Sequence, residues 1–350
     1  MPRGDCFYVA KFWNADTWLW AFLAIWKRMR EVMVQKVILI TGVNGFFGAW
    51  IARRLACRYR VVGIGRAAQC LTSLGVEYHQ MALPAGLSEL LAITRPDVVV
   101  HCAGSGSVPF SVAHPEEDFV AGPGLVTHLL ESIKQSSLVP TIIFPSSAAV
   151  YGNPQRLPIT ENSILQPISP YGRHKIISEE MLRDANRDYG IPFLIFRIFS
   201  GYGAGLRKQL LWDAAGKIIA GNCVLHGTGQ ETRDFIHAWD VARFMEQCIE
   251  NDVRNVTLNV AQGTGVTVRE LVELLASHLA AGVFPSFSGK VRAGDPLYWQ
   301  ADVSRLADLG FSTRISLEEG VAHFASWYLA DQRRRGHEPV FIPDGWKKML

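Results

Sequence analysis

The chain has 350 residues, of which 49% are hydrophobic and 19% charged, a composition that excludes disordered, collagen-like and coiled-coil proteins. Its 35 basic and 32 acidic residues leave a net charge of +3, without a basic block of the kind that binds nucleic acid. The six cysteines form no CxxC pair, which argues against a zinc or disulfide framework and favours a reducing, cytoplasmic location.

Residues 1–34 form an aromatic-rich extension whose apolar run, Trp18 to Trp26, is shorter than the ~20 residues that a membrane-spanning helix needs. Three interpretations stay open: an interfacial helix in which residues 12–30 contact a membrane, a helix docked on the main domain, or an extension created by an upstream start codon. We favour the third, or a weakly ordered extension, because the sequence from Met33 resembles the usual start of a cytoplasmic α/β protein.

The uninterrupted apolar run at 36–40 predicts a buried strand, and a helical pattern follows at 49–58. A glycine-rich turn separates them, in the strand–turn–helix context that dinucleotide binding requires. Its glycines would permit the tight turn, the approach of a pyrophosphate and close helix–strand packing. A glycine turn without a ligand is the alternative that this context disfavours. The residues expected to bind a dinucleotide here are Gly42, Asn44, Gly45, Phe46, Phe47 and Gly48.

A second strand, predicted at 60–64, precedes Arg66, which lies 24 residues after Gly42. An acidic side chain at this place accepts hydrogen bonds from the ribose hydroxyls of NAD, whereas a guanidinium pairs with the 2′-phosphate of NADP. Arg66 therefore favours NADP as the cofactor. NAD is the alternative, with Arg66 as a solvated loop residue.

Further apolar strands are expected at 98–100, 141–144 and 193–196, with helical stretches between them. This alternation predicts an α/β fold with a doubly wound parallel sheet. Ala103 follows the strand at 98–100, at the carboxyl edge where such sheets bind ligands, so we expect it to contact the cofactor. His101 and Cys102 lack a third ligand nearby, and no metal site is predicted.

Tyr171 and Lys175 lie four residues apart in a helical segment that runs to Tyr189, so they share one helix face. An ammonium group one turn from a phenol, together with a positively charged nicotinamide, favours the phenolate and brings proton transfer into range. Ser147, just past a strand, offers a hydroxyl that can bond the same substrate oxygen; its alternative role is a strand-end cap. These three residues form the candidate catalytic set.

The motifs TGxxGxxG, SSAAVYG at 146–152 and SPYxxxK at 169–175 together resemble the extended short-chain dehydrogenase/reductase superfamily, in its NAD-dependent epimerase/dehydratase branch. The resemblance extends over about residues 35–330 and includes RDFIHAWD at 233–240 and RAGDP at 292–296. It implies a Rossmann-type sheet with a smaller substrate-binding α/β region. It also implies that Tyr171 is the general acid/base, that Lys175 orients the nicotinamide ribose and that Ser147 holds the sugar. The positions that it assigns to nucleotide-sugar binding are Ser147, Ser200, Arg233, Arg292 and Asp295.

The resemblance also implies a domain division and a homodimer. The Rossmann domain would comprise 35–200 and 234–262, and the nucleotide-sugar-binding region would comprise 201–233 and 263–345. Ala148 and Ala149 stand where sugar dehydratases of this branch carry Asp and Glu, so a 4,6-dehydratase is not expected.

The leading hypothesis is redox chemistry at C4 of a nucleotide-activated hexose, by a 4-epimerase similar to UDP-glucose 4-epimerase, with a place in carbohydrate metabolism such as cell-surface polysaccharide biosynthesis. The alternative, favoured by Arg66, is an NADPH-dependent reductase of 4-keto-6-deoxy nucleotide sugars. A remote alternative is a non-catalytic NADP-binding sensor. The presence of Ser147, Tyr171 and Lys175 argues against it, because a sensor needs no proton-transfer set.

Overall fold

A computed structural model describes residues 35–71, 75–280, 282–290 and 296–333. The expectations for residues 1–34, membrane contact by 12–30 included, lie outside the described residues, as do those for Arg292 and Asp295. Within the described ranges, no helix combines the length and the apolar character needed to cross a membrane.

Seven strands of the described chain form one parallel sheet in the order β3-β2-β1-β4-β5-β6-β10. Their bounds are β1 (Val37–Thr41), β2 (Arg60–Gly65), β3 (Val76–Gln80), β4 (Val98–His101), β5 (Thr141–Ser147), β6 (Phe193–Ile198) and β10 (Val256–Val260). The strand order reverses between β1 and β4, and open α/β sheets bind ligands in the crevice at such a point. The sheet confirms the predicted α/β class. Strand β3 escaped prediction because it is an edge strand whose half-exposed sequence, VEYHQ, contains no apolar run.

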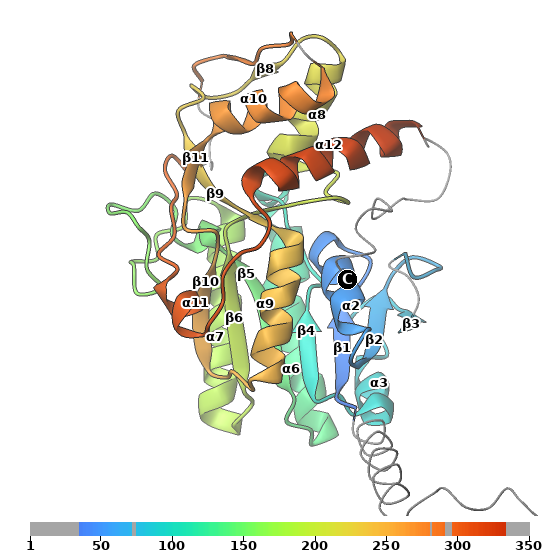
Figure 1. Cartoon of the computed structure of the whole chain (residues 1–350). Coiled ribbons are helices and arrows are strands. Elements are labelled where there is room, and N and C mark those ends of the chain that lie inside the picture. The colour runs from blue at the N-terminus through green and yellow to red at the C-terminus, as the bar shows by residue number, and fades with distance from the viewer. Residues whose placement is uncertain (1–34, 72–74, 281, 291–295, 334–350) are drawn as a thin grey trace, which may run out of the picture. The chain divides into compact units, whose positions relative to one another are not determined.

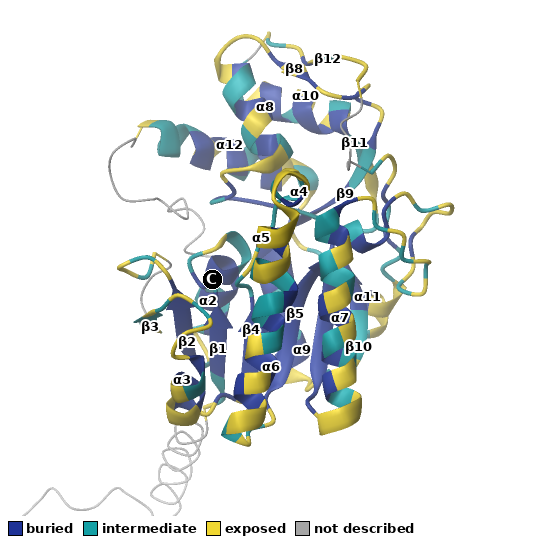
Figure 2. Cartoon of the chain, turned by 180° about the vertical axis from the view of Figure 1, so that it is seen from behind, coloured by how far each residue is buried: buried dark blue, intermediate teal, exposed yellow. Residues whose placement is uncertain are grey.

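Helices cover both faces of this sheet (Figures 1 and 2). On one face α2 (Phe46–Leu55) packs with α9 (Ala238–Glu250), and the other face carries α3 (Leu87–Thr94), α6 (Leu125–Ser136) and α7 (Pro170–Tyr189). Successive side chains of a strand point to opposite faces. Ile38 and Ile40 therefore join the core under α2 and α9, while Leu39 joins the core under the other three helices. Two apolar layers thus enclose the sheet, which explains the continuous apolar runs of its central strands.

The remaining elements lie outside the large sheet. The helices are α4 (Val108–Ala113), α5 (Pro115–Phe119), the π-helix η1 (Val120–Gly124), the 3₁₀-helix η2 (Ala148–Val150), α8 (Gln209–Ile219), α10 (Val268–Leu279), α11 (Ser304–Asp308) and α12 (Leu317–Arg333). Two small sheets are β11 (Gly265–Thr267) with β9 (Thr232–His237) and β7 (Ser200–Tyr202), and β12 (Ser286–Phe287) with β8 (Val224–Leu225). Helices α8, α10 and α12 pack on one another. The predicted domain boundaries stay a prediction.

Candidate active site

The glycine turn between β1 and α2 lies beside the carboxyl end of β4. Gly42 has φ = +66°, and a Cβ on it would lie 2.8 Å from the backbone nitrogen of Ala103. A Cβ on Gly48 would collide with the carbonyl oxygen of Gly42. The Ala103 amide donates a 3.1 Å hydrogen bond to Thr41 Oγ1, which ties the two strand ends together. Only glycine fits at both turn positions, because any side chain would push the turn away from β4 or from α2.

The first turn of α2 begins at Gly45 with no side-chain cap and no acidic residue. The first N–H groups of a helix lack intrahelical acceptors, and its amino end carries partial positive charge. This helix start therefore fits a pyrophosphate. The two phenylalanines of the turn pack beside each other, with ring centroids 4.9 Å apart, and the Phe47 ring lies against Gly201 of β7. The Phe47 side chain thus fills the space between α2 and the smaller sheet.

Asn44 holds the loop that follows β2. Its Nδ2 donates to the Gln69 carbonyl at 3.1 Å and to the Tyr78 hydroxyl at 3.3 Å, and its Oδ1 accepts from the Leu71 amide at 2.9 Å. The Asn44 side chain therefore shapes the loop through its own hydrogen bonds. Arg66, the first residue of that loop, is exposed.

The candidate catalytic residues come together at the carboxyl end of β5 and the start of α7. Ser169 caps α7 by accepting from the Gly172 amide at 3.2 Å, and Ser147 hydrogen-bonds to Tyr171. Ser147 Oγ also accepts from the Ala149 amide at 3.2 Å. Ser147 therefore caps the strand end, its expected alternative role, and bonds the tyrosine as well, because a hydroxyl has one donor and two acceptor sites. Its contact with a substrate oxygen stays a prediction.

Lys175 lies one turn below Tyr171 on α7. Its Nζ donates to the Pro145 carbonyl at 2.9 Å and lies 4.4 Å from the centroid of the Phe144 ring and 5.7 Å from that of the Tyr171 ring. Burial lowers the pKa of Lys175 to about 8. An ammonium has three N–H donors, so the bond to Pro145 leaves capacity for a ribose hydroxyl.

Burial also raises the pKa of the Tyr171 phenol to about 12, against the lowering effect of the Ser147 hydrogen bond and with the Asp118 carboxylate adding to the rise. Desolvation is the largest influence on this pKa, because an apolar surrounding penalises the charged form. Stabilisation of the phenolate by Lys175 together with a bound nicotinamide stays a prediction.

A further cation, Lys208, lies near this site and donates to the Gly106 carbonyl at 2.9 Å. Its neighbour Arg207 instead pairs with Asp331, with Nη2 and Oδ1 2.5 Å apart. Ser200 and Arg233 lie on adjacent strands of the small sheet, β7 and β9. Arg233 donates to the Thr232 carbonyl at 2.9 Å.

His101 does not assemble a metal centre. Its Nδ1 is 3.0 Å from Thr41 Oγ1, and burial lowers its pKa to about 3. Across the described ranges no group of three or more His, Cys, Asp or Glu side chains is placed to hold a metal ion.

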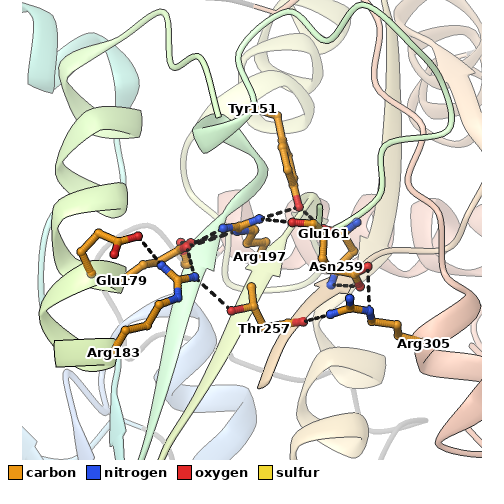
Figure 3. Close-up of polar contacts among 10 residues, drawn as sticks. Tyr151, Glu161, Glu179, Arg183, Arg197, Thr257, Asn259 and Arg305 are labelled. Carbon is orange, nitrogen blue, oxygen red and sulfur yellow. Dashed lines mark hydrogen bonds and ion pairs between the residues drawn. The ribbon is translucent and has the colours of Figure 1, made fainter. Parts of the chain in front are cut away.

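A buried polar network joins α7 to the sheet (Figure 3). Arg197 of β6 forms an ion pair with Glu179 of α7 (Nη2 to Oε2, 2.7 Å), with 3% and 0% of the side chains exposed. Glu179 also accepts from Ser146 Oγ at 2.6 Å. Arg197 reaches the Tyr151 hydroxyl at 3.0 Å, which donates to Asn259 at 2.6 Å. The network fixes α7 against β5, β6 and β10.

Two residues that the sequence analysis did not single out also lie here. Asp118, at the end of α5, contacts His174 of α7 at 2.6 Å between Oδ2 and Nδ1. They are 56 positions apart in sequence, and neither belongs to a motif that points to the other. Only the position of His174 between Tyr171 and Lys175 hinted at this pair.

The chain is similar in sequence and in fold to known proteins. Residues 38–261 match the profile of the NAD dependent epimerase/dehydratase family. The chain is 28% identical over 319 residues to a UDP-glucose 4-epimerase of Azospirillum brasilense, covering 83% of this chain and 91% of that protein. The structure of a UDP-glucose 4-epimerase from Thermotoga maritima with UDP-glucose superimposes with a TM-score of 0.78 at 25% identity, covering 85% and 99% of the two chains. One from Bifidobacterium longum with NAD+ and UDP gives 0.77 at 25% identity and the same coverage.

Proposed function

The chain belongs to the NAD dependent epimerase/dehydratase family, and on that premise we propose that it interconverts the C4 epimers of a UDP-activated hexose. The observation that carries the proposal is the meeting of Ser147, Tyr171 and Lys175 beside the glycine turn at the β1–β4 crevice. The relatives named above are UDP-glucose 4-epimerases, and the chain spans nearly their whole length.

The chain's own residues suit the two halves of this reaction. The backbone from Gly42 to Gly48 and the amide groups at the start of α2 would hold the dinucleotide, with Lys175 at its nicotinamide ribose. A bound oxidised nicotinamide supplies a hydride acceptor and a positive charge. Ser147 would hold the C4 oxygen while Tyr171 takes the hydroxyl proton. Loss of a hydride from C4 to that acceptor would leave a C4–O double bond. Return of the hydride to the opposite face of C4, with return of the proton from Tyr171 to the C4 oxygen, would give the epimer without net oxidation.

Turnover of UDP-glucose tests the proposal. The purified protein, supplied in separate assays with catalytic NAD+ and with catalytic NADP+, is expected to produce UDP-galactose up to a fixed equilibrium ratio, measured by chromatography of the nucleotide sugars. The net reaction consumes no cofactor, so an amount of either dinucleotide far below that of the sugar suffices. Failure to form an epimer from UDP-glucose, UDP-N-acetylglucosamine or UDP-glucuronate would contradict the epimerase.

Arg66 favours a second candidate, an NADPH-dependent reductase of 4-keto-6-deoxy nucleotide sugars. Its guanidinium is exposed at the start of the loop that Asn44 holds, at the place where an acidic residue would accept the ribose hydroxyls of NAD. A reductase would consume NADPH in proportion to product. Stoichiometric NADPH oxidation with a 4-keto sugar, together with no epimer from UDP-hexoses, would replace the epimerase by the reductase.

We propose that NADP is the preferred cofactor. Pairing of Arg66 with the 2′-phosphate would make NADPH bind about 10- to 100-fold more tightly than NADH, the range of a charge-assisted hydrogen bond. Arg66→Ala is expected to remove this difference in a fluorescence titration. Arg60→Ala, at the other end of β2 where Arg60 pairs with Glu77 at 2.8 Å, is the matched control and should preserve it. Equal or tighter binding of NADH to the unmodified protein would contradict the proposal.

The assignments of Ser200, Arg233, Arg292 and Asp295 to the nucleotide sugar also stay predictions. So do the homodimer, the cytoplasmic location and the role in polysaccharide biosynthesis.

A further inference from the structure

Asp118 is a buried carboxylate with one oxygen bonded and one not. Its exposed fraction is 1%, and Oδ2 accepts the 2.6 Å hydrogen bond from His174 Nδ1. Oδ1 is buried and has no hydrogen-bond partner in the part of the chain that the structure describes. A buried polar group usually finds a partner, because leaving it without one costs free energy. The negative charge on this oxygen is therefore not offset by a hydrogen-bond donor, and it acts on the buried groups nearby.

A small cavity lies in front of Asp118 and also touches the catalytic residues. Its walls include Asp118, His174, Tyr171, Lys175 and His101. Asp118 belongs to α5, His101 to β4 and the other three to α7, and α5 packs against α7. Among the described residues that line the cavity, Asp118 is the acidic one. Its carboxylate therefore supplies the negative charge of the cavity wall.

The negative charge of Asp118 shifts the pKa of both catalytic groups in the same direction, upward. It raises the pKa of the Tyr171 phenol, and it raises that of Lys175 against the dominant lowering by burial. A negative charge stabilises the protonated form of each group. The other titratable or charged groups that act on Lys175 or line the cavity are His101 at the end of β4, Cys102 just after it, Glu179 and His174 on α7, and Lys208 before α8.

We propose that Asp118, held by His174, is a positioning residue that sets the proton affinity of the Tyr171–Lys175 pair and so fixes the pH range of catalysis. It keeps the desolvated Lys175 ammonium charged at the upper end of that range. The same charge makes the phenol ionise at a higher pH. This inference rests on the proposed function, since it concerns the same proton-transfer pair.

Asp118→Asn isolates the charge. The amide oxygen of the new side chain can still accept from His174, so the hydrogen bond between α5 and α7 survives while the negative charge is lost. The two limbs of a pH–rate profile of kcat/KM report the macroscopic pKa values of the Tyr171–Lys175 pair in the holoenzyme. Loss of the negative charge lowers both pKa values, so both limbs of kcat/KM are expected to move to lower pH, by about one pH unit.

Glu117→Gln is the matched control, because it removes one negative charge from the adjacent position of the same helix. The Glu117 side chain is 68% exposed and pairs with His114. Solvent screens the Glu117 charge, so the pH–rate profile of Glu117→Gln should coincide with that of the unmodified protein. An Asp118→Asn profile that loses height while both limbs stay in place would show a merely structural role and overturn the proposal. So would an equal shift in the control.

A second measurement does not depend on turnover. Ultraviolet difference absorbance follows ionisation of the phenol, with Tyr171→Phe as the reference that isolates Tyr171. The phenolate is expected to form about one pH unit lower in Asp118→Asn than in the unmodified protein. A protein that shows this shift but epimerises no sugar would refute the proposed function and keep this inference. Unchanged ionisation of Tyr171 in Asp118→Asn, in a protein that epimerises the sugar, would refute this inference and leave the proposed function standing.

Discussion

Tyr171→Phe is expected to lower kcat by about 10²- to 10⁴-fold, the range that a positioned general acid/base contributes. The substitution keeps the aromatic ring and deletes the hydroxyl that bonds Ser147. Packing and cofactor binding should therefore persist while the C4 hydroxyl loses its proton acceptor. Initial rates of epimer formation, measured with saturating UDP-hexose, give the effect on kcat.

The matched control is Tyr189→Phe, the same substitution at the other end of α7, where the side chain is 55% exposed. It should leave kcat unchanged. Circular dichroism and dinucleotide titration of both variants separate loss of chemistry from loss of fold. Full activity in Tyr171→Phe would mean that another group moves the proton, and the assigned mechanism would be wrong.

Arg197→Met is expected to reduce the free energy of unfolding by about 3–5 kcal/mol, the cost of leaving one member of a buried ion pair without its partner. Glu179 would keep its charge in an apolar surrounding with the bonds from Ser146 and Arg183 as its remaining support. Urea unfolding followed by tryptophan fluorescence measures the change, provided that the transition is two-state.

Arg254→Met is the control, because Arg254 pairs with Asp252 at the surface, with 46% of its side chain exposed. Its effect should be much smaller, since solvent screens exposed pairs. The double variant Arg197→Met with Glu179→Gln should recover part of the loss, because it no longer buries a lone charge. A loss in Arg197→Met no larger than that of the control would show that the buried pair contributes nothing specific.

The sequence allowed prediction of what depends on local pattern. The β1–turn–α2 unit is an apolar run, three glycines and a helical period in one short stretch, and the structure contains it with bounds of 37–41 and 46–55. The Tyr171–Lys175 pair was equally accessible, because four residues on a helix fix the relative direction of two side chains. Local pattern thus located the glycine turn and placed Tyr171 and Lys175 on one face of α7.

Contacts between distant segments escaped prediction. Asp118 meets His174 only because α5 packs on α7, and Arg197 meets Glu179 only because β6 lies under α7. Single residues of this kind have no period or motif. Asn44 illustrates the same limit: its side-chain hydrogen bonds to the loop after β2 could not be predicted, and its contact with a dinucleotide stays a prediction.

The ion pair between Arg207 and Asp331 has a consequence for synthesis of the protein. It anchors the segment just before α8 to the end of α12, 124 positions later. Chains emerge from the ribosome amino end first, and early segments begin to fold before late ones exist. Strands β1, β2 and β4 with their glycine turn are available early, but the anchor of Arg207 arrives almost last. In a nascent chain the glycine turn and its strands can therefore fold well before the Arg207–Asp331 ion pair joins the two ends of the proposed sugar-binding region.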